Sequence, residues 1–129
     1  MAEKILIVDD ETDMLVLLRI VIQMQTSYEP VITPNPLEVE KILAEKEIAL
    51  VIADMDMPGM DGFQLLEMIQ ANYPLIPVII ITAHDRPGAA EEAQRKGAFD
   101  FFPKPFRRER IIQAIEQGLA LRRSALALV

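Results

Sequence analysis

At its centre the chain reads Leu50-Val51-Ile52-Ala53-Asp54-Met55-Asp56-Met57-Pro58-Gly59-Met60-Asp61-Gly62. The first four residues are apolar, which is typical of a strand buried on both faces of a parallel sheet. Pro58, Gly59 and Gly62 then turn the chain away. This pattern places Asp54 at the carboxyl end of a central strand, where open α/β sheets bind their ligands.

A second acidic cluster ends another apolar run. Residues 5–8 lead directly into Asp9, Asp10 and Glu11. Two such clusters meeting in one pocket would suit a hard divalent cation, because these ions take oxygen ligands. Without a cation the packed carboxylates would repel one another and bind protons. One of them, Asp54, would be available as a nucleophile.

Strand and helix patterns alternate along the whole chain. The predicted strands are residues 5–8, 31–33, 48–53, 77–82 and 99–102. Apolar residues at helical spacing follow each strand; the predicted faces are Met14, Leu17, Leu18 and Val21, then Val39, Ile42 and Leu43, then Leu65, Leu66 and Ile69, and finally Ile111, Ile112, Ile115 and Leu119. Parallel strands joined by right-handed crossover helices predict an α/β, doubly wound, five-stranded parallel sheet in the order 2-1-3-4-5, with helices on both faces, as in flavodoxin-like folds.

The helix expected over residues 87–96, before Gly97, differs from the others. Its buried side offers only Ala89, Ala90 and Ala93. Small side chains bury little area. We therefore expect either a loosely held helix that can shift or tight alanine packing against the sheet.

Composition narrows the class of protein. A length of 129 residues with 51% hydrophobic residues fits one globular domain, and the absence of Cys excludes disulfides and thiolate metal sites. No leader and no apolar stretch of about 20 residues is found, so a cytoplasmic protein without membrane contact is expected.

The net charge is −7, yet residues 95–123 carry eight basic and three acidic side chains. This segment is either a solvated helix or a docking face for an acidic partner, and no motif for direct nucleic-acid binding accompanies it.

Four strand ends carry residues that suit phosphoryl transfer. At the ends of the first, third, fourth and fifth predicted strands stand Asp9 and Asp10, Asp54, Thr82 and Lys104, respectively. Asp54 would be the nucleophile, the two aspartates would hold Mg²⁺, and the hydroxyl and ammonium groups would contact phosphoryl oxygens. Positioning and charge neutralisation are nearly all that such a reaction needs.

Taken together, these motifs resemble the receiver (REC) domain of two-component response regulators. The resemblance covers residues 3 to about 120. It is carried by Asp9-Asp10-Glu11, Asp54-x-x-Met57-Pro58-x-Met60-Asp61-Gly62, Thr82-Ala83 and Gly97-Ala98-x-Asp100-Phe101-x-x-Lys104-Pro105-Phe106. Any one of these motifs alone would be weak, but all occur in order at strand ends.

The resemblance implies a phosphoacceptor role for Asp54. The phosphoryl group would come from a phosphohistidine of a sensor histidine kinase or phosphotransfer protein. Mg²⁺ would be held by Asp9, Asp10, Asp54 and the backbone carbonyl of Asp56. The chain would assist its own phosphorylation and dephosphorylation but would otherwise act as a switch and not as an enzyme.

The resemblance also implies how the switch works. Thr82 and Lys104 would engage the phosphoryl group, and Phe101 would be the aromatic switch residue that moves when Thr82 is drawn toward the phosphate. The surface of the fourth helix, fifth strand and fifth helix would then bind an output domain or protein, or form a homodimer. The residues that flank the pocket are Met55, Asp56, Ala83 and His84. Of these, Asp56 and His84 would influence the lifetime of the phosphoryl group, although an ordinary exposed loop histidine is the favoured interpretation of His84.

Residues 3–121 are expected to form the receiver domain. The remaining residues, 122–129, begin with Arg122 and Arg123 and end in apolar side chains. We interpret them as a C-terminal helix extension or a truncated linker.

Two other enzyme or cofactor classes share parts of the pattern. A haloacid-dehalogenase-type aspartyl-phosphate phosphatase also begins with a strand ending in Asp-x-Asp, but it needs a late acidic pair, and after Lys104 only Glu109 and Glu116 remain. A flavodoxin-like cofactor module would need a Ser/Thr/Gly-rich phosphate loop where this chain is acidic. A receiver used as a constitutive binding module is the third alternative.

Overall fold

The sheet is built around β3 (Ile48–Asp54), whose residues are all buried. In the computed structural model, which describes residues 2–129, β1 (Lys4–Val8) and β4 (Val78–Thr82) pair with β3 in parallel, and β2 (Glu29–Thr33) and β5 (Asp100–Pro103) form the two edges. The order is β2-β1-β3-β4-β5, so the predicted sheet is confirmed.

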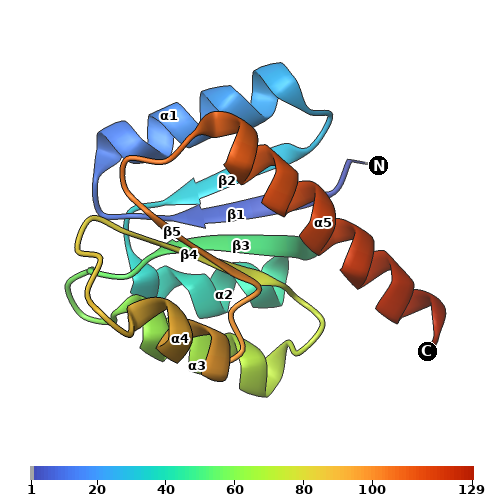
Figure 1. Ribbon diagram of the computed structural model, residues 1–129. Coiled ribbons are helices and arrows are strands. Elements are labelled where there is room, and N and C mark those ends of the chain that lie inside the picture. The colour runs from blue at the N-terminus through green and yellow to red at the C-terminus, as the bar shows by residue number, and fades with distance from the viewer. Residues whose placement is uncertain (1) are drawn as a thin grey trace.

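Helices cover both faces of the sheet. Figure 1 shows α-helices on both faces, as the prediction of a doubly wound fold requires. The first face carries α1 (Thr12–Gln25) and α5 (Arg108–Ala127); the second carries α2 (Val39–Glu45), preceded by the short 3₁₀ helix η1 (Pro36–Glu38), then α3 (Gly62–Asn72) and α4 (Ala89–Arg95). A hydrophobic cluster fills the space on each side of the sheet. No helix within residues 2–129 is both long and apolar enough to cross a membrane.

The face of α1 that contacts the sheet differs in part from the prediction. Leu18 and Val21 are buried as expected, but Leu17 is 44% exposed, and Leu15 and Ile22 are buried instead. The first half of this helix is apolar at consecutive positions, so periodicity alone could not choose between two overlapping stripes. Packing against the sheet and α5 makes that choice.

The short helix α4 begins two residues later than predicted. Gly88 has a φ of 84°, a left-handed conformation that excludes it and Pro87 from the helix. Ala89 and Ala93 are buried, but Ala90 is exposed, contrary to the prediction. Two alanines are therefore all that this helix buries, and at about 25 cal/mol per Å² they hold it weakly.

Candidate functional site

The loop after β3 is held tightly where it leaves Asp54. The amide of Gly62 donates a hydrogen bond to the carbonyl oxygen of Met55 at 2.8 Å. A Cβ atom at Gly62 would lie 2.7 Å from the carbonyl oxygen of Asp54, so only glycine permits this close approach. Asp61 and Gln64 form a reciprocal capping box that starts α3 at the same point. The turn predicted by the sequence thus fixes the backbone beside the carboxylate.

Three aspartates from neighbouring strand ends come together. Asp9 and Asp10 follow β1, Asp54 ends β3, and one carboxylate oxygen from each lies within 4.8 Å of the others. Asp9 and Asp54 are buried, whereas Asp10 is exposed. Several carboxylate oxygens around one point, with one side open to solvent, are the donor set of a hard divalent cation. The predicted meeting of the two acidic clusters is therefore confirmed as geometry.

Lys104 reaches this carboxylate cluster from the far edge of the sheet. Its Nζ lies 3.3 Å from Asp54 Oδ1, 3.1 Å from Asp9 Oδ2 and 2.9 Å from Glu11 Oε1, and its side chain is only 10% exposed. The backbone amide of Lys104 also donates to the carbonyl of Thr82, which places the lysine beside the end of β4. The sequence analysis assigned Glu11 to an acidic cluster but did not predict its ion pair with Lys104. The one available indication was that three consecutive acidic residues follow a strand.

Burial and neighbouring charges shift the proton affinities of these groups. Burial, followed by the negative charges of Asp9 and Asp10, raises the pKa of Asp54 to about 6, although Lys104 opposes the rise. Burial also raises the pKa of Asp9. For Lys104, burial alone would lower the pKa, but hydrogen bonds to Glu11 and Asp9 outweigh it and raise the pKa above its ordinary value. Lys104 therefore stays protonated, and the carboxyl group of Asp54 changes its charge near pH 6.

Thr82 belongs to a second group of polar side chains at the same sheet edge. Its Oγ1 donates to Asp56 Oδ2 at 3.3 Å and accepts a hydrogen bond from the amide of His84 at 3.0 Å. His84 Nδ1 lies 3.0 Å from the same Asp56 oxygen. We call Asp56, Thr82 and His84 the flanking cluster. The sequence indicated the backbone carbonyl of Asp56 as a metal ligand and Asp56 and His84 as neighbours of the pocket. It did not reveal these side-chain contacts, which join two loops distant in sequence.

The remaining predicted residues surround these two groups. Met55 is buried, and Ala83 is exposed at the start of the β4–α4 loop. His84 is mostly exposed, as expected of a loop histidine, yet it also contacts Asp56. Phe101 pairs with Ile80 between β5 and β4 and is partly buried against the core. It therefore sits where a side chain can respond to changes at the end of β4.

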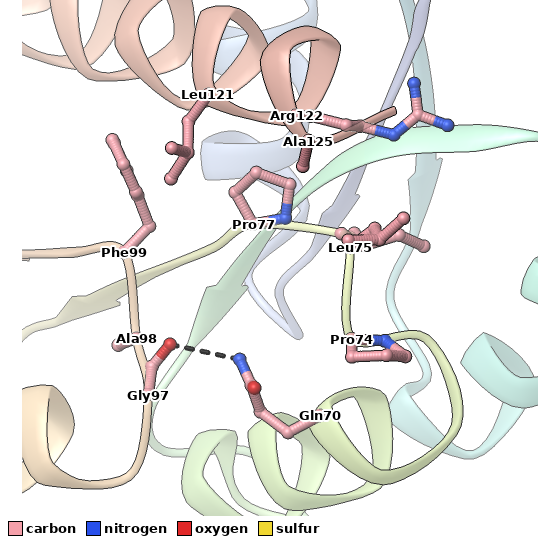
Figure 2. Close-up of a pocket in the computed structure, with 11 residues that line it drawn as sticks. Gln70, Pro74, Leu75, Pro77, Gly97, Ala98, Phe99, Leu121, Arg122 and Ala125 are labelled. Atoms are coloured by element: carbon pink, nitrogen blue, oxygen red, sulfur yellow. Dashed lines mark hydrogen bonds between the residues drawn. The ribbon is translucent and has the colours of Figure 1, made fainter. Parts of the chain in front are cut away.

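A hollow of about 480 Å³ lies at the opposite end of the sheet, where the strands begin. Figure 2 shows its lining, which includes Pro77 before β4, Phe99 before β5, and Leu121 of α5, with Gln70 donating to the carbonyl of Gly97. None of its lining residues belongs to the carboxylate cluster or the flanking cluster. Because parallel strands begin at this edge and end at the other, the hollow is separate from the candidate site.

Comparison with known proteins agrees with this geometry. The sequence model described as the response regulator receiver domain matches residues 5–116. The chain is 42% identical over 86 residues to the DNA-binding transcriptional regulator NtrC of Escherichia coli K12, a match that covers 67% of this chain and 18% of that protein. It is 38% identical over 116 residues to a putative response regulator NtrX-like protein of Rickettsia bellii, covering 88% of this chain and 24% of that one.

A solved structure extends the agreement to the whole fold. The response regulator receiver domain protein of Clostridium thermocellum superposes with a TM-score of 0.87 at 30% identity, covering 96% of this chain and 98% of that one. The chain spans only about a fifth to a quarter of the length of the two curated relatives. These matches do not favour the dehalogenase-type alternative. The chain belongs to the response regulator receiver domain family, whose members are phosphoacceptors in two-component signalling.

Proposed function

We propose that Asp54 is the phosphoacceptor of this receiver and that its donor is a phosphohistidine on a sensor histidine kinase or phosphotransfer protein. A carboxylate oxygen of Asp54 forms the new bond to phosphorus. The bond between phosphorus and the donor nitrogen breaks, and its electron pair stays on the imidazole. The product is an acyl phosphate on Asp54, formed in the cytoplasm.

One observation carries this assignment. Asp54 is a carboxyl group that is 3% exposed, held 3.3 Å from a lysine ammonium at the edge where its strand ends. Its pKa of about 6 leaves it ionised, hence nucleophilic, at neutral pH. The lysine offers the attacking carboxylate and the incoming phosphoryl group a charge that needs no reorganisation.

The carboxylate cluster fits Mg²⁺ as its resident cation. Side-chain oxygens of Asp9, Asp10 and Asp54, with the backbone carbonyl of Asp56, would hold the ion, and the spacing of the first three supports this. When bound, Mg²⁺ neutralises charge on the carboxylates and on the phosphoryl oxygens. Asp9 Oδ1 accepts a hydrogen bond from the backbone amide of Glu11, and this bond orients the Asp9 carboxylate toward the cluster.

Thr82 and Lys104 are proposed to hold the phosphoryl oxygens, and Phe101 to transmit the change. Thr82 is buried at the end of β4, and Phe101 pairs with the strand two residues before it. The weak anchoring of α4 supports a surface of α4, β5 and α5 that rearranges and binds an output domain, another protein or a second copy. We further propose that residues 3–121 form the receiver and that residues 122–129 are either a C-terminal extension of its last helix or part of a linker.

Intact mass spectrometry tests the assignment. The protein is incubated with Mg²⁺ and either acetyl phosphate or phosphoramidate, whose P–N bond resembles that of phosphohistidine. We expect one phosphoryl group on the wild type and on Asp85→Asn, a matched loss of charge on the exposed β4–α4 loop. We expect none on Asp54→Asn or in EDTA.

Two results would count against the proposal in different ways. Equal labelling of Asp54→Asn would move the phosphoacceptor to another residue. An unlabelled but folded wild type with both donors would favour a receiver that acts as a constitutive binding module.

A further inference from the structure

The hydroxyl group of Thr82 already donates a hydrogen bond in the free protein. A threonine hydroxyl carries one proton and can donate one hydrogen bond. That proton points to Asp56 Oδ2, and the lone pairs of Oγ1 accept from the amide of His84. Thr82 is 1% exposed, so water does not compete for it. Before Thr82 can donate to any other oxygen, it must release Asp56.

The side chain of Asp56 is held by His84, whereas the other carboxylates of the site are held by Lys104. Its Oδ2 also contacts His84 Nδ1 at 3.0 Å, whereas the ammonium of Lys104 contacts Asp9, Glu11 and Asp54 instead. The carboxylates that gather within 4.8 Å of one another do not include Asp56. The side chain of Asp56 therefore serves Thr82 and His84 and not the cation site.

From these contacts we infer that Asp56 is a positioning residue that competes with the phosphoryl group for the Thr82 hydroxyl. This inference rests on the proposed role of Thr82 in binding phosphoryl oxygens. In the free protein, Asp56 and His84 hold the β4–α4 loop in its resting position. On phosphorylation the Thr82 hydroxyl keeps its proton but donates it to a phosphoryl oxygen in place of Asp56 Oδ2, and the loop leading to the weakly anchored α4 is released.

The competition has a measurable size. A hydrogen bond to a charged acceptor changes an equilibrium by about tenfold or more. Asp56 is half exposed, so the lower end of that range applies. Removing the acceptor with Asp56→Ala should therefore tighten binding of a phosphoryl mimic about tenfold. The backbone carbonyl proposed as a metal ligand is retained in every Asp56 variant.

Binding of beryllofluoride with Mg²⁺, followed by ¹H–¹⁵N NMR, is the first measurement. Asp56→Asn keeps an acceptor oxygen and removes the charge, so it should tighten binding less than Asp56→Ala. Asp85→Ala removes a nearby charge from the same loop and should bind like the wild type. Equal tightening in Asp56→Ala and Asp56→Asn would mean that charge repulsion, and not the hydrogen bond, is responsible, and would overturn the inference.

A double-mutant cycle with Thr82→Val gives the decisive comparison. Valine has the same shape without the hydroxyl, so Asp56→Ala should no longer tighten binding in that background. Tightening of the same size with and without the hydroxyl would refute the competition. If Thr82→Val in an intact fold binds the mimic as well as the wild type does, the proposed role of Thr82 fails, which is a distinct outcome.

The free protein supplies a readout that needs no phosphoryl chemistry. Three-bond couplings should report one Thr82 side-chain rotamer in the wild type and rotamer averaging in Asp56→Ala. A wild type that already averages would contradict the resting contact itself, whatever the result with the mimic.

Discussion

Replacing Asp54 by asparagine should make the metal-free protein more stable, and by an amount that depends on pH. The pKa of Asp54 rises from 3.8 to about 6, chiefly through burial. At about 1.4 kcal/mol for each tenfold change in proton affinity, this corresponds to about 3 kcal/mol. The side chain is only 5% exposed, so solvent screening reduces this figure little.

The sign follows from the direction of the shift. The folded protein binds the Asp54 proton more tightly than the unfolded chain does, so the wild type loses stability as the pH rises from about 4 through about 6. Asparagine cannot ionise and does not share this loss. The stabilisation by Asp54→Asn should be about 1.5 kcal/mol at pH 5 and about 3 kcal/mol at pH 7.5. Lys104 keeps Asp9 and Glu11 as partners in the variant.

Urea unfolding in EDTA between pH 5 and 8, followed by far-ultraviolet circular dichroism, measures this difference. Asp85→Asn serves as the control and should unfold like the wild type at each pH. Added Mg²⁺ should narrow the gap, because the ion stabilises the ionised cluster of the wild type only. Parallel pH profiles for the wild type and Asp54→Asn would refute the claim that buried charge at Asp54 destabilises the metal-free fold.

Four further substitutions test three separate parts of the structure. Lys104→Met should lower the rate of phosphorylation by acetyl phosphate at least tenfold while Mg²⁺ still binds in a titration, because the lysine contributes charge and no metal ligand; an unchanged rate would contradict its role. Gly62→Ala should lower the free energy of unfolding by about 2 kcal/mol or more, measured by urea, since its Cβ would lie 2.7 Å from the carbonyl oxygen of Asp54. Leu18→Ala should cost about 2–5 kcal/mol, and Leu17→Ala less than about 1 kcal/mol, in the same assay; equal losses would show that α1 buries the face that the sequence predicted.

Much of the fold could be read from local patterns. The buried run before Asp54, the glycines and proline after it, and the alternation of strands with helices are properties of neighbouring residues. Steric rules then leave right-handed crossovers and one common strand order, so the sheet and the edge that carries Asp9, Asp54, Thr82 and Lys104 followed without coordinates.

The finer packing could not be read in this way. The buried stripe of α1 was decided by what α1 touches, because two apolar stripes overlap in its sequence. The start of α4 was decided by the backbone conformation of Gly88. Both depend on neighbours or angles that residue type alone leaves open.

The same division holds at the site. The sequence by itself determined which chemical groups reach the carboxyl edge of the sheet, because a side chain at a strand end has only one edge to occupy. Only the tertiary structure decided their partners: Lys104 meets Glu11, 93 residues away, and Asp56 meets Thr82 across 26 residues. Hydrogen bonds and ion pairs act over about 3 Å, a distance that depends on strand register, twist and loop path and that no local pattern contains.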